Sequence, residues 1–177
     1  MIKDITVFRY GHREIRDYRV TSHCSLVARA FGAKKIIVCG EKDESMKNSV
    51  DDVTKRWGGP FKIVFVKNWE KKLKNLKKKG YILVHLTMYG QEIIDKEEEI
   101  SKKDKVCIII GSQKVEKEVY LISDYNISIT IQPHSEIAAL AVIMDRIQKG
   151  KQFNKKFLRA KKLIVPMKKG KKVIDLK

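Results

Sequence analysis

The sequence predicts an α/β fold in which helices cover both faces of a mostly parallel sheet. Along residues 1–150, short apolar runs of strand length alternate with longer helical patterns, which is the order of repeated βαβ units. The runs are apolar at nearly every position, as is typical of strands buried on both faces. The segment from Val106 to Ile147 shows the pattern most clearly, because two apolar runs each end in a polar loop and the second loop opens an apolar helix. Ligands of such sheets bind just beyond the carboxyl ends of the strands.

The individual elements follow from these runs and from the stop signals between them. The predicted strands are residues 5–9, 35–39, 61–66, 81–88 (with a bend near its end), 106–110 and 127–131. The predicted helices are residues 23–31, 43–57, 69–79, 91–103 and 136–147. Thr21 or Ser22 is expected to cap the first helix. Residues 10–19, which include three arginines and one histidine, are expected to form a loop.

The pattern changes after Gly150. Residues 161–166 and 171–176 flank Met167-Lys168-Lys169-Gly170, an arrangement typical of a β-hairpin. We therefore expect one α/β domain over residues 1–150 and a C-terminal extension with a β-hairpin over residues 151–177. No apolar run approaches the roughly 20 residues needed to span a membrane. We also expect no signal peptide, because the first residues lead directly into a strand.

Charge narrows the class of partner. The chain has 39 lysines and arginines against 21 aspartates and glutamates, a net charge of +18. Such an excess predicts a polyanionic partner, most often nucleic acid. The alternative is that lysine-rich clusters serve solubility alone. Three cysteines, Cys24, Cys39 and Cys107, lie in apolar surroundings without CxxC spacing, which favours core residues of a cytoplasmic protein in a reducing compartment.

Few residues carry a recognisable catalytic or binding motif. GxGxxG, Walker A and HExxH patterns are absent, and the four histidines are scattered without ligand spacing, so we expect no metal site. Gly111 follows a strand, where glycine lets a ligand approach the backbone closely, although it also fits an ordinary turn. Gln132-Pro133-His134 precedes the apolar helix, and its proline fixes the loop, although the segment is equally a plain helix start.

Several ordered segments together resemble one family. The loops at Gly111 and Gln132 resemble the second and third motifs of the SPOUT class, the knotted methyltransferases. The segments FRYGHREIRDYRVTSHCSLVARAFGA, RWGGPF, VHLTMYG and QPHSEIAALAV with its following DR resemble the archaeal tRNA cytidine-56 2′-O-methyltransferases. The resemblance runs from about Phe8 to the C-terminal extension, so it covers nearly the whole chain.

The resemblance implies a fold, a reaction and a set of partners. It implies a deep trefoil knot in the C-terminal half, a rare exception to unknotted topology. It also implies a homodimer with shared active sites, and methyl transfer from S-adenosyl-L-methionine to the ribose 2′-oxygen of cytidine 56 in the T-loop of tRNA. Carried over by motif, the cofactor contacts would be Leu86, Gly111, Ser112, Gln113, Lys114, Val115, Ile127, Ser128, Ile129, Thr130, Ile131, Gln132, Pro133 and His134. The chain departs from the family pattern at Thr130-Ile131, where that pattern has a Gly-Asn pair.

The same resemblance implies an arginine near the N-terminus that assists the reaction. A ribose hydroxyl is a very weak acid, and arginine is essentially never deprotonated, so a hydrogen-bonding and phosphate-anchoring role suits it better than that of a base. Arg19 is the first candidate and Arg29 the second, while His23 and Ser135 are candidates for orienting the hydroxyl or its phosphate. Two other classes stay open from the sequence, a catalytically silent RNA-binding module and a nucleotide-binding regulator.

Overall fold

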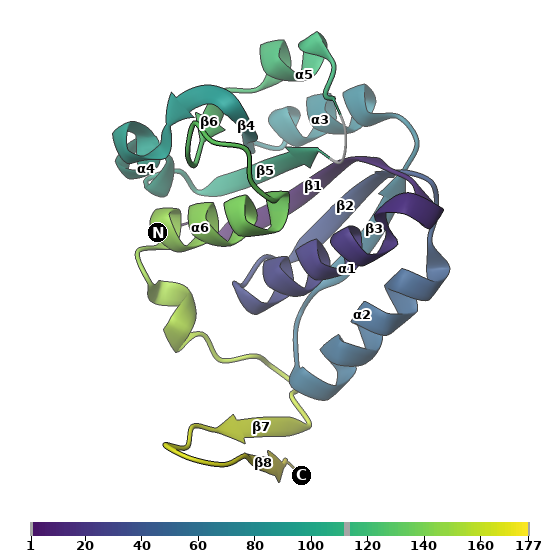
Figure 1. Ribbon diagram of the computed structural model, residues 1–177, viewed down its shortest axis with the longest axis vertical. Coiled ribbons are helices and arrows are strands. Elements are labelled where there is room, and N and C mark those ends of the chain that lie inside the picture. The colour runs from purple at the N-terminus through teal and green to yellow at the C-terminus, as the bar shows by residue number, and fades with distance from the viewer. Residues whose placement is uncertain (1, 112–113, 177) are drawn as a thin grey trace.

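The computed structural model describes residues 2–111 and 114–176. Six strands form one sheet in the order β3-β2-β1-β5-β4-β6, and all the paired neighbours run parallel (Figure 1). The strands of this sheet are β1 (Asp4–His12), β2 (Lys35–Gly40), β3 (Lys62–Val66), β4 (Ile82–Glu92), β5 (Lys105–Gly111) and β6 (Tyr125–Ser128). The helices are α1 (Glu14–Ala30), α2 (Glu44–Trp57), α3 (Trp69–Lys78), α4 (Ile93–Ser101), α5 (Lys117–Ile122) and α6 (Glu136–Gln148), with a 3-10 turn at Lys151–Asn154.

Helices lie on both faces of the sheet (Figure 1), and each face has its own apolar core. One core joins the sheet to α1, α2, α4 and α6, with Val7, Ile108 and Leu140 among its members. The other joins the opposite face to α3 and α5, with Phe8 and Leu73 among its members. Successive strand residues such as Val7 and Phe8 therefore pack on opposite sides. This confirms the expected α/β fold with a mostly parallel sheet, and it explains why the strands are apolar throughout.

The expected loop over residues 10–19 is wrong, because β1 continues to His12 and α1 begins at Glu14 rather than at residue 23. The Asp17 carboxylate accepts a hydrogen bond from the backbone N–H of Arg13 (2.9 Å), which satisfies a donor at the helix start. Thr21 and Ser22, the expected caps, both lie in the middle of the helix. The buried stripe of α1 consists of small, polar or charged residues, so no apolar period marks the helix in the sequence. These residues are Asp17, Thr21, Cys24, Ser25, Ala28 and Arg29.

The remaining comparisons with the predicted elements concern the carboxyl end of the sheet. The short helix α5 was not expected. β6 ends at Ser128, so the run 129–131 is not a strand, and Ile131 is 67% exposed. β4 is interrupted, because Leu86 and Gln91 both pair with Ile127 and the residues between them leave the ladder. The bend expected in this strand is thus confirmed, and α4 begins two residues later than predicted.

The C-terminal strands β7 (Lys162–Val165) and β8 (Lys172–Asp175) pair antiparallel and stand apart from the main sheet (Figure 1). A backbone bridge between Gly59 and Leu158 ties the segment before them to the end of α2. No helix in the described part of the chain combines the length and apolar character needed to cross a membrane.

Candidate active site

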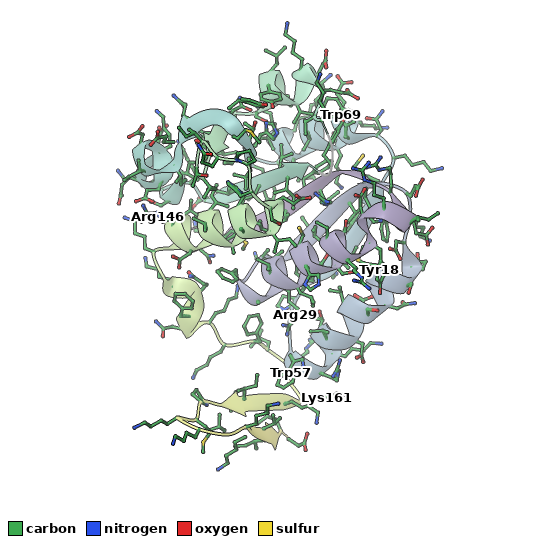
Figure 2. The ribbon with its side chains drawn as sticks, in the orientation of Figure 1. Tyr18, Arg29, Trp57, Trp69, Arg146 and Lys161 are labelled. Atoms are coloured by element: carbon green, nitrogen blue, oxygen red, sulfur yellow. The ribbon has the colours of Figure 1, made fainter. Side chains whose placement is uncertain are left out.

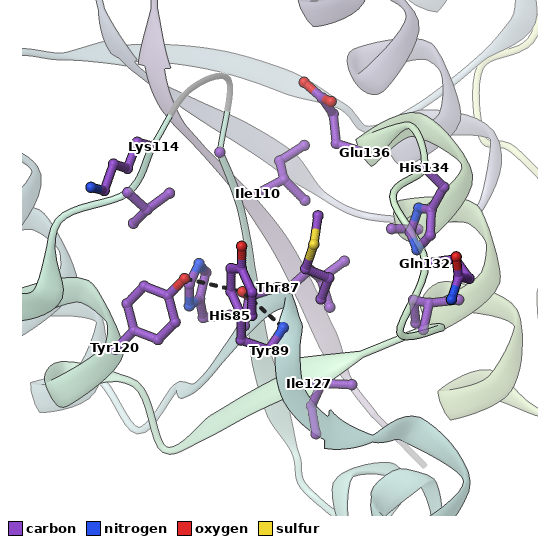
Figure 3. Close-up of a pocket in the computed structure, with 16 residues that line it drawn as sticks. His85, Thr87, Tyr89, Ile110, Lys114, Tyr120, Ile127, Gln132, His134 and Glu136 are labelled. Carbon is purple, nitrogen blue, oxygen red and sulfur yellow. Dashed lines mark hydrogen bonds between the residues drawn. The ribbon is translucent and has the colours of Figure 1, made fainter.

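A pocket of about 360 Å³ lies beyond the carboxyl ends of β4, β5 and β6 (Figure 3). This is the edge where ligands of parallel sheets bind, and the volume lies in the range of small-molecule sites. The interrupted part of β4, the loop after β5 and the loop between β6 and α6 form its walls. The lining residues are His85, Leu86, Thr87, Met88, Tyr89, Ile110, Gly111, Lys114, Val115, Tyr120, Ile127, Ile129, Gln132, His134, Glu136 and Ala139.

His85 is the most deeply buried polar group of the pocket, with 1% exposure. Its Nδ1 lies 2.9 Å from the Asn126 side-chain oxygen, and the Asn126 amide nitrogen donates to the Tyr120 carbonyl. Because that oxygen can only accept, His85 Nδ1 is assigned as the donor. The Tyr120 ring packs edge-on against His85, and its hydroxyl is 3.1 Å from Thr87 Oγ1. Burial lowers the pKa of His85, although the hydrogen bond to Asn126 opposes the shift, so the ring is neutral near pH 7.

The loop that leads into α6 is held by hydrogen bonds of its own. Thr130 Oγ1 accepts from the backbone N–H of Gln132 (3.2 Å), which closes a tight turn at the position where the family pattern differs. The Ser135 side chain accepts from the backbone N–H of Ile137 (3.2 Å) and caps the helix. His134 Nδ1 lies 3.1 Å from the Ser135 carbonyl oxygen. The hydroxyl of Ser135 is thus engaged in helix capping.

A buried ion pair connects the central strand to the first residue of α6. Arg9 of β1 has no exposed side-chain surface, and its Nη1 lies 2.8 Å from Glu136 Oε1. Its Nε donates to Thr21 Oγ1 (3.3 Å), which also contacts His12 Nδ1 at 2.9 Å. His12 Nε2 in turn lies 3.8 Å from the buried Asp43 carboxylate. Burial lowers the pKa of His12, with the charge of Asp43 opposing that effect.

The structure brings most of the predicted cofactor contacts together. The predicted contacts that line the pocket are Leu86, Gly111, Lys114, Val115, Ile127, Ile129, Gln132 and His134. Ser128 is buried beside them without lining it, and Thr130, Ile131 and Pro133 are exposed on the loop. Ser112 and Gln113 lie outside the described residues. The lining residues that the sequence did not indicate come mainly from β4, α5 and α6, among them His85, Tyr89, Tyr120 and Glu136.

The predicted catalytic residues on α1 do not line the pocket of their own chain. Arg19 and His23 are exposed on the helix surface. Arg29 is buried at the opposite end of α1, near Trp57 and the start of the C-terminal segment (Figure 2). Its Nη2 donates to the Gly58 carbonyl at 2.5 Å, and its guanidinium lies 5.1 Å from the centre of the Phe157 ring. Burial lowers its pKa, and these contacts tie the C-terminal segment to the domain.

The lining fits S-adenosyl-L-methionine, which needs an apolar slot for adenine and polar groups for its ribose and its amino-acid end. Leu86, Val115, Ile127 and Ile129 supply apolar walls, and the backbones of the two loops supply donors and acceptors. Lys114 supplies a cation suited to a carboxylate. Within residues 2–111 and 114–176, no three His, Cys, Asp or Glu side chains gather as ligands for a metal ion.

Solved structures with a similar fold include enzymes of the SpoU type. The A. aeolicus TrmH/SpoU tRNA modifying enzyme superposes with a TM-score of 0.64 at 17% identity, over 86% of this chain and 77% of that one. The SpoU methyltransferase AviRb from Streptomyces viridochromogenes, solved in complex with AdoMet, superposes with a TM-score of 0.59 at 16% identity, over 85% and 59% of the two chains. At such identities the likeness concerns the fold alone.

Relatives found by sequence comparison share a much higher identity with this chain. The chain is 52% identical to the tRNA (cytidine(56)-2′-O)-methyltransferase of Thermococcus kodakarensis, over 99% of both chains. It is 49% identical to the enzyme of that name from Methanocaldococcus jannaschii, over 96% of both. The model of the family described as "tRNA ribose 2′-O-methyltransferase, aTrm56" matches residues 57–174. These matches confirm the expected relationship, and the chain belongs to the aTrm56 family of tRNA ribose 2′-O-methyltransferases.

Proposed function

We propose that this enzyme transfers a methyl group from S-adenosyl-L-methionine to the 2′-oxygen of cytidine 56 in tRNA. One observation carries the proposal: the motif loops of a chain about half identical to enzymes of that name enclose a small-molecule pocket at the carboxyl edge of the sheet. The excess of 39 basic over 21 acidic residues supports a tRNA substrate.

The residues of the pocket act by binding and alignment. The bound cofactor supplies an electrophilic methyl group, and the apolar walls around Leu86 and Ile127 hold its adenosyl part away from water. The loops 111–115 and 129–134 present backbone groups, and Lys114 pairs with the carboxylate of the amino-acid end. Arg19 stays the first candidate for anchoring the target nucleotide, with Arg13 and Arg16 as phosphate contacts beside it. Arg29 lies near the C-terminal end of α1 and donates a hydrogen bond to the Gly58 carbonyl, so it is the weaker candidate.

The assembly belongs to the same proposal. We take the enzyme to be a cytoplasmic homodimer, with residues 1–150 forming a SPOUT domain that contains the trefoil knot and residues 151–177 forming the extension. α1 and α6 pack side by side (Figure 1) and leave apolar side chains uncovered, including Ile15 (99% exposed) and Val142 (40%). A partner subunit packed there would cover this surface and would bring its own α1 close to the site. Light scattering at micromolar protein should report a dimer, and a monomer would argue against a shared site.

The reaction is tested with unmodified tRNA transcript, protein and S-adenosyl-L-methionine without added metal, followed by nuclease digestion and mass spectrometry. A single methyl group should appear on the ribose of cytidine 56. A transcript with 2′-deoxycytidine at that position should stay unmodified. Methylation of the deoxy transcript, or of a base, would refute the assignment.

The role of Arg19 is tested with two variants. Arg19→Ala should lower the methylation rate much more than cofactor affinity, because its partners are on the RNA. Arg19→Lys should restore the rate only in part, since an ammonium lacks the guanidinium fork. Normal turnover by Arg19→Ala would remove this residue from the mechanism and leave the enzyme assignment standing.

A further inference from the structure

Glu136 is the only carboxylate among the described residues that line the pocket. It is the first residue of α6, and in Figure 3 its side chain extends from the helix start away from Gln132 and His134. The side chain is 31% exposed, so it is open to a ligand on one side and anchored on the other. Sequence motifs give it no role, because an acidic residue in the first turn of a helix is ordinary helix chemistry.

The anchor of Glu136 is the guanidinium of Arg9. Arg9 lies in the central strand β1, where its register partner in β5 is Ile110, a residue of the pocket wall. Its side chain is fully buried, with Thr21 as a neutral partner at Nε. Among the described residues, Glu136 is the one carboxylate within ion-pair distance of Arg9. A buried cation requires a nearby anion, so this ion pair keeps the Glu136 carboxylate beside Arg9 at the rim, through charge rather than through a hydrogen bond.

Transfer to a ribose hydroxyl releases a proton, and few groups in the pocket can accept it. Arginine remains protonated and cannot act as a base. His85 is buried, and its ring is held by Asn126 and Tyr120. His134 is exposed, and among the described residues its hydrogen-bond partner is the carbonyl of the adjacent residue. Among the described lining residues, Glu136 combines an acceptor, an open side and a buried ion-pair partner.

We infer that Glu136 accepts the proton of the ribose 2′-hydroxyl and that Arg9 is its positioning residue. The inference rests on the proposed function and deepens it. As the 2′-oxygen uses a lone pair to form the bond to the methyl carbon, the carbon–sulfur bond breaks and its electron pair stays on sulfur, which becomes a neutral thioether. The hydroxyl proton passes to a Glu136 carboxylate oxygen and then leaves to water through the exposed side.

The main test compares Glu136→Gln with the wild type in single-turnover methylation at saturating cofactor and tRNA. Gln keeps the size and an oxygen that can accept from Arg9 but removes the base, so the rate should fall by about 100-fold or more. Calorimetry with S-adenosyl-L-methionine and tRNA-binding assays should give affinities within about threefold of the wild type, because the loss concerns the transition state. Glu97→Gln is the matched control. Glu97 lies on α4 and forms an ion pair of 2.8 Å with Arg146 of α6, away from the pocket. This variant should keep the wild-type rate.

Chemical rescue by a small carboxylate distinguishes loss of the catalytic base from loss of the folded structure. In Glu136→Ala, added formate or acetate should restore part of the lost rate in proportion to its concentration, whereas chloride at equal ionic strength should not. If thermal denaturation shows that Glu136→Gln does not fold, Glu136→Asp is the second variant, since it keeps the negative charge opposite Arg9. It should fold, bind cofactor normally and turn over at least about tenfold more slowly, because a base displaced by one methylene loses alignment.

Arg9 is tested by a double-mutant cycle. Arg9→Gln should slow methylation in the wild-type background but change little further in Glu136→Gln, because Arg9 acts through that carboxylate. A structural role alone would lower the rate equally in both backgrounds.

The outcomes distinguish this inference from the proposed function. A wild-type protein that methylates no tRNA ends the proposed function, whatever Glu136 does. With an active wild type, a near-normal rate of Glu136→Gln would overturn the inference. So would a loss of cofactor affinity that accounts for the whole effect, which would make Glu136 a ligand of the cofactor. A selective rate loss in His134→Gln beside an active Glu136→Gln would assign the base to His134 instead.

Discussion

Removal of Glu136 should cost much more stability than removal of Arg9, although the two residues form one ion pair. In Glu136→Ala the Arg9 guanidinium stays fully buried and loses its anion, with the Thr21 hydroxyl as its remaining described partner. Breaking a buried pair in this way costs about 3–5 kcal/mol. In Arg9→Met the unpaired group is the Glu136 carboxylate, which is 31% exposed and therefore partly solvated. Methionine fills much of the vacated space, so we expect a loss of about 1–2 kcal/mol.

Urea unfolding followed by circular dichroism at fixed protein concentration measures the difference. With a slope of about 2–3 kcal/mol per molar urea, Glu136→Ala should lower the midpoint by about 1–2 M and Arg9→Met by less than about 1 M. The double variant should be more stable than Glu136→Ala alone, because it no longer buries an unpaired cation. Equal losses in the two single variants, or a double variant less stable than Glu136→Ala, would refute the account of Arg9 as a buried cation that depends on Glu136.

Three other predictions concern the cofactor loop, pH and RNA binding. Gly111→Val should weaken S-adenosyl-L-methionine binding in calorimetry by obstructing the backbone at the pocket wall, and tight binding by this variant would remove Gly111 from the site. The buried neutral histidines His12 and His85 have lowered pKa values, so the unfolded chain binds more protons as pH falls below about 6.5. The free energy of unfolding should therefore decrease from pH 7 towards pH 5, by at most about 1.4 kcal/mol per pH unit for each histidine, and His85→Gln should flatten the curve measured by urea titration. Three lysines on α3, Lys71, Lys72 and Lys78, form no ion pair with the described part of the chain. Replacing all three by alanine should reduce the slope of log binding constant against log salt concentration for tRNA by up to about 2–3, if they contact phosphates. An unchanged slope would place the RNA on another face.

The sequence predicts the sheet and the pocket loops because their signals are local. Apolar runs mark the strands, and Gly111 and Pro133 mark loops at the carboxyl edge of the sheet. The same local signals fail for the start of α1, whose buried stripe includes Asp17, Thr21 and Ser25 instead of apolar residues. A helix that packs polar groups against a buried arginine cannot be recognised from hydrophobic periodicity.

The site residues that escape the sequence depend on contacts across the fold. Arg9 and Glu136 are far apart in the chain, and each has an ordinary local interpretation, one as a polar residue in a short strand and the other as an acidic helix start. Arg29 is a second example. It is buried, and its partners are the Gly58 carbonyl and the Phe157 ring, which no local pattern indicates.

The two buried arginines are held in opposite ways, and the contrast indicates where the chemistry lies. The described contacts of Arg29 are a backbone carbonyl and an aromatic ring, partners that belong to the connection between the domain and the C-terminal segment. Arg9 occupies the central strand of a sheet whose other inward positions are largely apolar, where an aliphatic side chain would avoid the cost of desolvating a charge. Neither its Nη1 nor its Nη2 makes a hydrogen bond to the described residues, and its anion is a carboxylate at the pocket rim, 2.8 Å from Nη1. Departures from good packing rules are expected at functional sites. A fully buried cation paired with the one carboxylate among the described lining residues is such a departure, and the role inferred for Glu136 would account for it.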